Sequence, residues 1–460
     1  MDPRYDIIVI GSGPGGYVAA IRAAQCGKRV AIVEKADAGG VCLNWGCIPT
    51  KALVRSAQVF ADCKAAATYG VAIEGEVKPD WTKMVERERT VASTMNKGVQ
   101  FLLKKNNINV IAGFGRLKAQ DIVEVDGVDY EADHIILATG ARPRVMPFMP
   151  IDGKHIISSK EALVLPELPE TMVVVGSGAI GSEFAYIYAT MGVKVTIVEY
   201  MPQIMPLEDE DTAKAMERAF RKLRATVMTS TTVKSVAVRE DGKCDVVIEG
   251  KKGEQTLEAD VVLSAVGIKS NIEDMGLEEL GIEIERDKIK VDEHYKTNID
   301  GVYAIGDIIA TPALAHVASA EAIHCVEHIC GLNPEAVDYS TIPSCIFTSP
   351  EVASVGMTEA QVKAQGIEYK VGKFPYTASG KATAAGERDG FVKLIFDAEE
   401  KLLGAHFVGH NVTEMIGEPT LAKVLGVNAH RIARTIHAHP SMHEAVMEAA
   451  EDALGCAIHM

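Results

Sequence analysis

The hydrophobic positions of this chain fall into short apolar runs, and several of these runs end at a glycine-rich turn. Runs at 6–10 and 29–33 flank an alanine-rich segment that reaches about Gly27. Apolar runs of this length are typical of strands buried on both faces, which alternate with helices in parallel sheets. The same order recurs at 172–175 and 195–198. The pattern therefore predicts two βαβ units in one chain.

Further apolar runs predict additional strands at 134–137, 261–266 and 302–305. From about Tyr339 the runs become shorter, which indicates an antiparallel sheet with strands at 345–347, 369–374 and 392–396. Helical periodicity follows at 413–425 and 445–455. At 460 residues the chain exceeds one hydrophobic core, so several domains are expected. The predicted fold is α/β, with an α+β segment at the C-terminal end.

Each βαβ unit carries the spacing GxGxxG in its first turn, with an acidic residue eighteen positions after the last glycine. The glycines let a pyrophosphate approach the backbone, the helix N-terminus stabilises its charge, and the acid accepts from a ribose hydroxyl. One such motif is weak evidence because glycines occur by chance at strand ends. Two complete units predict two dinucleotides and electron transfer between them. The residues are Gly11, Gly13, Gly16 and Glu34, then Gly176, Gly178, Gly181 and Glu199.

The second acid indicates which nicotinamide dinucleotide would bind. Glu199 would accept a hydrogen bond from a ribose 2′-hydroxyl and repel a 2′-phosphate. The following residues, 200–203, include no arginine that could bind that phosphate. The second unit is therefore predicted to bind NAD in preference to NADP.

Two cysteines, Cys42 and Cys47, lie five positions apart directly after the first unit. In an ideal helix this spacing gives a rise of about 7.5 Å, whereas a disulfide needs Cα atoms within about 7 Å. A bridge would require a distorted helix start, for which Gly39, Gly40 and Gly46 provide the backbone freedom. From the spacing alone, two unrelated buried cysteines remain an alternative.

The other seven cysteines show no organised framework, and the total of nine is odd. Cys325 and Cys330 repeat the five-residue spacing, but they lie in an apolar helical run without a glycine break and are interpreted as core residues. This usage favours a reducing compartment with catalytic use of one pair. No signal or transit peptide precedes the first strand at Tyr5, and no apolar run reaches membrane-spanning length. A cytoplasmic location without membrane attachment is expected.

The net charge of −16 argues against a nucleic-acid partner. Near the C-terminus, residues 436–444 contain three histidines and a glutamate. Histidine titrates near neutral pH, and a carboxylate can orient it as a base. A zinc site is the alternative for such a cluster, but it contains no cysteine and its spacing is irregular for structural zinc. The prediction is a catalytic base and no metal.

The segment from Gly39 to Leu53 reads GGxCLNxGCIPxKAL. It resembles the redox motif of the pyridine nucleotide–disulfide oxidoreductases, most closely that of the dihydrolipoamide dehydrogenase branch, and the resemblance extends over essentially the whole chain. It implies two Rossmann-like dinucleotide-binding domains plus a C-terminal α+β dimerisation domain. The implied divisions are an FAD-binding domain at 1–142, an NAD-binding domain at 143–267, a central domain at 268–338 and an interface domain at 339–460.

The resemblance also implies roles for individual residues. Cys42 and Cys47 would form the redox disulfide, with Cys47 next to the flavin and Cys42 facing the substrate. Lys51 would pair with Glu183 beside the flavin. The family motif HPxxxE places the base at His439 and its partner at Glu444, with Ser441 where the family usually has threonine. The implied FAD residues are Gly11, Gly13, Gly16, Glu34, Lys51, Thr139, Gly140, Asp307 and Ala315. The implied NAD residues are Gly176, Gly178, Gly181, Glu183, Glu199 and Gly267.

The implied activity is oxidation of protein-bound dihydrolipoamide through the disulfide and FAD, with reduction of NAD. The implied partners are a second copy of the chain, and the lipoyl domains and acyltransferase core of 2-oxoacid dehydrogenase complexes or the lipoyl carrier of glycine cleavage. Glutathione reductases would have an arginine where this chain has Ile21. Mercuric and large thioredoxin reductases end in a second thiol or selenol pair, whereas only Cys456 lies near this C-terminus. A redox-regulated binding scaffold is the alternative from another class.

Overall fold

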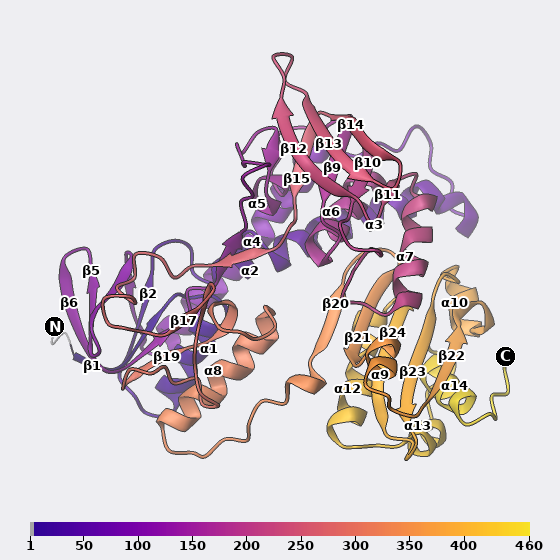
Figure 1. Ribbon diagram of the computed structural model, residues 1–460. Helices are drawn as coiled ribbons and strands as arrows, with labels where there is room; N and C mark the ends of the chain where they lie inside the picture. Colours follow the sequence, from indigo (N-terminus) through magenta and orange to yellow (C-terminus); the bar gives the residue numbers. More distant parts are fainter. Residues whose placement is uncertain (1–3) are drawn as a thin grey trace. The chain divides into compact units, whose positions relative to one another are not determined.

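Both predicted βαβ units are present in the computed structural model, which describes residues 4–460 (Figure 1). The chain divides into two compact units. The first comprises the described residues up to Ala52, with Thr82–Arg144 and Gly267–Val337; the second comprises Leu53–Trp81, Val145–Val266 and Asp338–Met460. The dividing points fall inside α3 (Cys47–Ala65) and at the start of α4 (Trp81–Lys105). The four-domain division stays a prediction.

The first unit contains a parallel sheet in the order β3-β2-β1-β6, with β19 pairing on the far side of β6. An antiparallel branch, β4-β5, continues from β6. Helix α1 (Pro14–Gln25) joins β1 to β2, and α8 (Ala315–Ile329) follows β19. The strands are β1 (Arg4–Ile10), β2 (Val30–Glu34), β3 (Asn109–Ala112), β4 (Gly115–Ala119), β5 (Ile122–Val125), β6 (Val128–Leu137) and β19 (Val302–Ala304).

The strands of this sheet are buried on both faces, as their continuous apolar runs predict. Ile7, Ile8 and Val9 have no exposed surface, and they pair with residues 30–32 of β2 and 134–136 of β6. The alanine-rich face of α1 covers the sheet with Ala19, Ala20 and Ala23. Small side chains here let the helix lie close to the strands.

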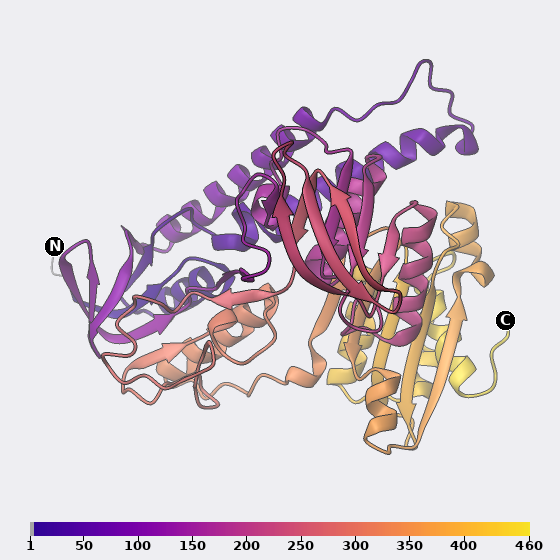
Figure 2. The same ribbon diagram turned by 45° about the horizontal axis from the view of Figure 1, so that its top comes forward.

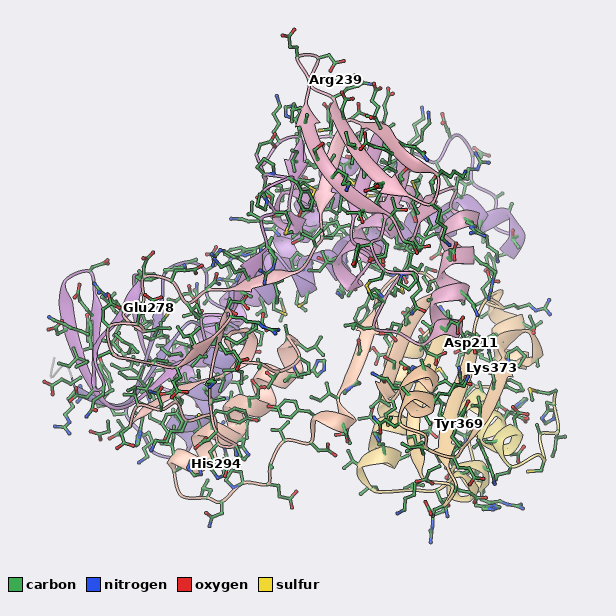
Figure 3. The ribbon with its side chains drawn as sticks, in the orientation of Figure 1. Asp211, Arg239, Glu278, His294, Tyr369 and Lys373 are labelled. Atoms are coloured by element: carbon green, nitrogen blue, oxygen red, sulfur yellow. The ribbon has the colours of Figure 1, made fainter. Side chains whose placement is uncertain are left out.

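The second unit repeats this topology. Its parallel sheet has the order β11-β10-β9-β15-β8, and α6 (Ala179–Thr190) joins β9 to β10. A separate antiparallel sheet, β12-β13-β14, packs on it through one hydrophobic core (Figure 2). Arg239 follows β12 in the turn that leads to β13 (Figure 3). The strands are β8 (Ile156–Ile157), β9 (Thr171–Val175), β10 (Lys194–Val198), β11 (Thr226–Met228), β12 (Thr232–Val238), β13 (Cys244–Gly250), β14 (Gly253–Ala259) and β15 (Val261–Ser264).

The C-terminal part of the second unit is an antiparallel sheet in the order β20-β21-β24-β23-β22, packed against α14 (Glu444–Ala453). The strands are β20 (Pro343–Ile346), β21 (Glu351–Gly356), β22 (Tyr369–Pro375), β23 (Phe391–Asp397) and β24 (Leu402–Gly409). Three of them match the predicted runs, whereas β21 and β24 were not predicted. The helix predicted over 413–425 is divided into α11 (Val412–Met415) and α12 (Gly417–Val424). Gly417 and Pro419 explain the break, since both residue types interrupt a helix interior.

Candidate active site: two dinucleotide turns, a thiol pair and a histidine

The two glycine-rich turns have the same backbone geometry. Gly11 and Gly176 lie in the left-handed region, with φ of 100° and 96°. A Cβ on either would collide with a carbonyl oxygen at the end of the neighbouring strand, that of Ala138 or Ala265. The third glycines, Gly16 and Gly181, are equally restricted, because a Cβ on each would collide with the carbonyl of the first glycine. Both turns therefore require glycine at these positions.

The middle glycine of each turn faces open space. Apart from the adjoining chain, no atom of the described residues lies within 4 Å of a Cβ built at Gly13 or at Gly178. Each of these glycines is the N-cap of its helix, α1 or α6, and no side chain caps either one. The free N–H groups and the positive end of each helix are thus accessible to an anion. This geometry fits a dinucleotide pyrophosphate at each turn.

The acid of each unit is hydrogen-bonded to the serine that follows the first glycine. The Ser12 hydroxyl and backbone N–H donate to Glu34 Oε2 at 2.6 and 2.9 Å. Ser177 donates to Glu199 Oε2 at the same two distances, and Glu199 is only 6% exposed. The second oxygen accepts from one more backbone N–H, that of Ala36 or Met201. Neither serine was predicted as a site residue, although both fingerprints show serine at this position.

The redox motif lies directly against the first turn. Gly39 donates its N–H to Ser12 O at 3.0 Å, and a Cβ on Gly40 would lie 2.7 Å from the Gly13 Cα. Both glycines have positive φ, of 95° and 60°. The cysteine segment is therefore packed on the backbone of the nucleotide turn.

The helix containing the two cysteines is interrupted between them. Cys42 lies in α2 (Gly40–Asn44), whereas Cys47 begins α3, and a Cβ on Gly46 would lie 2.9 Å from Val41 O. All described cysteines are free thiols in the structure, and a hydrogen bond joins Cys42 to Cys47. The interrupted helix that a bridge would require is therefore present, and the disulfide itself stays a prediction.

The electrostatics of this pair are uneven. The hydrogen bond with Cys47 raises the pKa of the Cys42 thiol well above its ordinary value, burial adds to the rise, and the positive charge of Lys51 opposes it. Within the reduced pair, the environment of Cys42 therefore favours its protonated form.

Two asparagines that were not predicted as site residues hold the loop before Cys42. Asn44 donates to the carbonyls of Ala38 and Gly40, and Asn96 of α4 donates to the same Ala38 carbonyl at 2.8 Å. Asn44 belongs to the quoted sequence motif and could have been identified from it. Asn96 lies 52 positions away in the chain, so no local pattern marks it.

The remaining predicted flavin residues gather at the carboxyl ends of β6 and β19. The Thr139 hydroxyl donates to Asn271 O at 2.6 Å, and Asn271 donates to Gly140 O at 2.9 Å. Asp307 follows β19, and burial raises the pKa of its carboxyl group. Within residues 4–460 no donor contacts that carboxylate, so it is available to the hydroxyls of a ligand. This unpartnered carboxylate and the open turn at Gly13 fit the flavin dinucleotide.

The other predicted residues are placed as follows. Ala315 begins α8. Glu183 is buried in α6, where it accepts a hydrogen bond from the N–H of Phe347 at 3.0 Å. Gly267 has a φ of 105° and follows Ala265, in the same relation that Gly140 has to Ala138. The Lys51–Glu183 pair would join the two compact units and stays a prediction.

The predicted histidine and its acid are in contact. His439 Nδ1 lies 2.8 Å from Glu444 Oε1, while the other oxygen of Glu444 accepts from the Ser441 N–H. Burial tends to raise the pKa of Glu444, but these hydrogen bonds prevail and lower it, which keeps the carboxylate charged. The His439 side chain is 78% exposed, so its second nitrogen is accessible.

The neighbouring histidines have a different acidic partner. His437 and His443 both contact Glu418, at 2.7 and 2.8 Å. Across residues 4–460, no three His, Cys, Asp or Glu side chains are grouped so that they could hold a metal ion. In the same part of the chain, no helix is both long and apolar enough to span a membrane.

Comparison with known proteins assigns the family. The model of the pyridine nucleotide-disulphide oxidoreductases matches residues 5–322, and the model of their dimerisation domain matches residues 342–450. Dihydrolipoyl dehydrogenases from Chlorobaculum tepidum and Rhizobium etli are 48% and 45% identical, covering 98% and 99% of this chain and 97% and 99% of their own lengths. A crystal structure of LpdA from Mycobacterium tuberculosis has a TM-score of 0.90 and 27% identity, over 97% of this chain and 99% of that one. The chain belongs to the pyridine nucleotide–disulphide oxidoreductases, with two Rossmann-like domains and an α+β dimerisation domain.

Proposed function

We propose that this chain is an NAD-dependent dihydrolipoamide dehydrogenase that oxidises protein-bound dihydrolipoamide to lipoamide. The observation that carries the proposal is the hydrogen-bonded Cys42–Cys47 pair packed on the first dinucleotide turn. A thiol pair in this place can exchange electrons with a dithiol substrate on one side and with a bound dinucleotide on the other. The full-length relatives named dihydrolipoyl dehydrogenase support the choice of substrate.

The chain uses FAD in the first turn and NAD in the second. Gly11, Gly13, Gly16 and Glu34 would hold the adenosine and pyrophosphate of FAD, and Asp307 would bind hydroxyls of its sugar chain. Bound FAD supplies a two-electron relay between the thiol pair and the nicotinamide. Glu199 and the second turn would hold NAD, because a buried carboxylate disfavours the 2′-phosphate of NADP.

Thiol–disulfide exchange is the chemical step assigned to the cysteines. One substrate thiolate attacks Cys42 of the oxidised pair, which forms a mixed disulfide and releases Cys47 as a thiolate. The second substrate thiol then loses its proton and displaces Cys42, so the substrate leaves as a disulfide. The two electrons it has lost remain on the cysteine pair.

His439 is the base that removes the protons of the substrate dithiol. Its Nδ1 contacts the charged Glu444, which orients the ring and stabilises its cation, and its Nε2 remains free for the substrate. We infer that this histidine serves the cysteine pair of a second subunit, as the family resemblance implies.

The active form is a homodimer. The matched dimerisation domain and four exposed apolar side chains support this assignment. Ile436, which directly precedes the histidine segment, is 96% exposed, and the other three lie on α12 or at its end: Leu421, Val424 and Leu425. Exposed apolar groups of this kind favour burial against another chain. The proposed location is cytoplasmic, and the proposed partners are lipoyl domains of 2-oxoacid dehydrogenase complexes or the lipoyl carrier of glycine cleavage.

The proposal is tested by turnover. The purified protein should reduce NAD when dihydrolipoamide is added, and Cys42→Ser and Cys47→Ser should each abolish this reaction. Cys63→Ser, which removes another half-buried thiol, is the matched control and should retain the rate. Binding of both dinucleotides without turnover would favour the scaffold alternative, and turnover of oxidised glutathione in its place would reassign the substrate.

A further inference from the structure

A second pair of cysteines lies at the ends of two neighbouring helices in the first unit. Cys26 is the C-cap of α1, and Cys330 is the C-cap of α8. They are separated by most of the chain, and the sequence pattern placed Cys330 in the core. Cys325 is fully buried as expected, whereas Cys330 is only partly buried and packs against the edge of the core.

The topology explains why these two caps meet. β1 and β19 both pair in parallel with β6, so the helices that follow them run in the same direction. α1 and α8 lie side by side along their length (Figure 1). Their C-terminal ends therefore fall at the same edge of the sheet.

Two contacts fix the register between the helices. Near their N-termini, a Cβ on Gly15 would lie 3.4 Å from that of Ala318. One turn before the caps, the Arg22 guanidinium donates to Glu327 Oε1 at 2.5 and 3.0 Å. Facing residues thus differ in number by 303 at the first contact and by 305 at the second. The offset between Cys26 and Cys330, 304, lies between these two values, so the caps face each other.

The two thiols are in contact and reachable. Burial and a hydrogen bond with the Cys26 thiol raise the pKa of Cys330 to about 11, while Lys28 and Arg22 act in the opposite direction. Neither cysteine is fully buried, unlike Cys325 on the same helix. Small reagents can therefore reach the pair.

We propose that Cys26 and Cys330 form a second redox-active dithiol, which a low-molecular-weight disulfide oxidises to a disulfide bridge. The Cys26 thiolate attacks one sulfur of the small disulfide and releases one small thiol, leaving a mixed disulfide on Cys26. Cys330 loses its proton and displaces the second small thiol. The two protein thiols lose two electrons and two protons in total, and the two released thiols carry them away.

This modification differs from the catalytic disulfide in what it connects. Cys42 and Cys47 close a loop of a few residues, whereas a Cys26–Cys330 bridge closes one of about three hundred. A bridge that closes a long loop restricts the unfolded chain more than one that closes a short loop. The Cys26–Cys330 bridge is therefore expected to stabilise the first unit. Formation of this bridge does not depend on which dithiol the enzyme oxidises.

Peptide mapping of the holoenzyme tests the proposal directly. The protein is equilibrated with glutathione buffers of increasing oxidised fraction, quenched with acid, alkylated and digested without reduction. Mass spectrometry should find a peptide linking Cys26 to Cys330, and the link should disappear after treatment with excess reduced glutathione. Oxidation of the Cys42–Cys47 pair in the same samples serves as an internal control for the buffers.

Variants and thermal unfolding complete the test. Cys26→Ser and Cys330→Ser should each abolish the link, and Cys63→Ser should retain it. Oxidation should raise the unfolding temperature of the unmodified protein by several degrees, but not that of Cys26→Ser. Alkylation of Cys26 and Cys330 in buffers that fully oxidise Cys42 and Cys47 would show that both remain free thiols, and it would overturn the proposal. Separate glutathione adducts on the two residues without a link would also overturn it.

Discussion

At the scale of single residues, His439 is the group whose role is most sharply testable. A positioned base typically contributes about 10²–10⁴-fold to a rate, so His439→Gln should lower dihydrolipoamide turnover by a factor in that range. Reduction of an artificial acceptor by NADH should change far less, because it does not involve a substrate dithiol. Steady-state rates of both reactions on one preparation provide the measurement.

The neighbours of His439 supply graded controls. Glu444→Gln keeps a hydrogen-bond acceptor for the ring but removes the charge, so it should cause a smaller loss than His439→Gln. His437→Gln should change turnover least, because His437 is paired with Glu418 and lies outside the matched motif. An equal loss in all three variants would mean that the segment is merely structural.

Glu199 determines the expected choice between NAD and NADP. Its carboxylate is buried and accepts hydrogen bonds from Ser177 and Met201, and we propose that it lies where the 2′-phosphate of NADP would have to fit. The unmodified protein should show the higher kcat/KM with NAD, and Glu199→Ala should narrow the difference. Glu199→Gln, which keeps the shape and loses the charge, separates electrostatic from steric exclusion. A higher kcat/KM for NADP in the unmodified protein would contradict the assignment.

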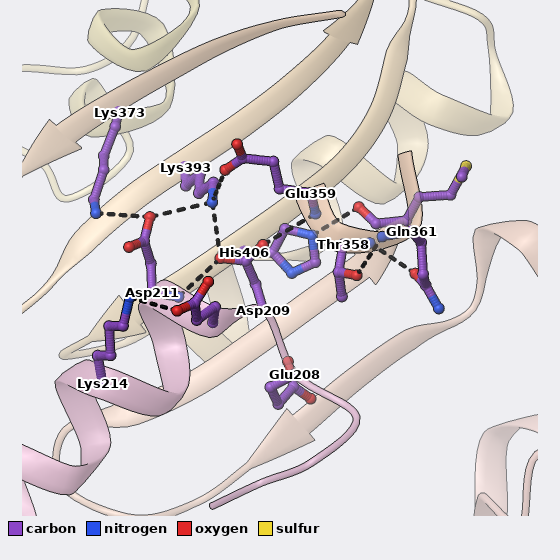
Figure 4. A network of polar contacts seen from close by, with 12 residues as sticks. Glu208, Asp209, Asp211, Lys214, Thr358, Glu359, Gln361, Lys373, Lys393 and His406 are labelled. Carbon is purple, nitrogen blue, oxygen red and sulfur yellow. Dashed lines mark hydrogen bonds and ion pairs between the residues drawn. The ribbon is translucent and has the colours of Figure 1, made fainter. Parts of the chain in front are cut away.

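At the scale of secondary-structure elements, a buried ion cluster connects α7 (Glu210–Lys222) to the C-terminal sheet (Figure 4). Lys393 of β23 is 2% exposed, and its ammonium contacts three carboxylates at 2.7–3.1 Å: Asp209, Asp211 and Glu359. Asp209 also caps α7 by accepting from the Asp211 N–H. The positive charge of Lys393 thus balances the negative charges of carboxylates that lie on several different elements.

Removal of that cation should be costly. Lys393→Met leaves the buried Asp209 unpaired, and loss of one partner from a buried pair typically costs about 3–5 kcal/mol. The midpoint of urea unfolding should fall accordingly. Lys222→Met removes an exposed pair with Asp389 and should change the free energy of unfolding by less than about 1 kcal/mol. Equal effects in the two variants would show that burial of the cluster has no energetic consequence.

The same cluster predicts how stability responds to acid. Burial raises the pKa of Glu359, but hydrogen bonds from Lys363, Lys393 and Tyr369 prevail and lower it to about 2. The unfolded value is about 4.3, so this stabilisation is complete above that pH and is lost as the pH falls toward 2. Urea unfolding between pH 5 and 2.5 should show this decline. In Lys393→Met this decline in stability should be flattened or reversed, because protonation would then remove the charge of buried carboxylates that have lost their cation.

The elements also show how far local sequence carries a structural prediction. Both βαβ units were predicted because their strands are continuous apolar runs and their turns carry glycine at fixed spacing. β21 and β24 were not, although both lie in the core of the C-terminal sheet. Contacts between residues that are far apart in the chain could not be predicted from the local sequence either. Asn96 reaches the redox loop from α4, and Cys26 meets Cys330 only because two parallel strands share a neighbour.

At the scale of the whole molecule, the proposed active site requires two chains. His439 and the apolar residues of α12 are exposed on a single chain, and Glu418 connects α12 to the histidine segment through His437. Pairing of these surfaces would bury the apolar groups and bring the base to a partner. A monomeric variant should therefore bind both dinucleotides and lack dihydrolipoamide turnover.

Subunit mixing distinguishes a shared site from one contained in a single chain. Cys42→Ser and His439→Gln homodimers should both be nearly inactive. In a mixed dimer, one of the two composite sites combines an intact Cys42 with an intact His439, so about half of the wild-type rate should return per heterodimer. If each active site were contained within one chain, every site in the mixed dimer would lack either Cys42 or His439, and no activity would return. A mixture of Cys42→Ser with Cys47→Ser is the matched control, since no arrangement of those chains restores a complete pair. Absence of recovery in heterodimers verified by two affinity tags would place base and disulfide in the same chain.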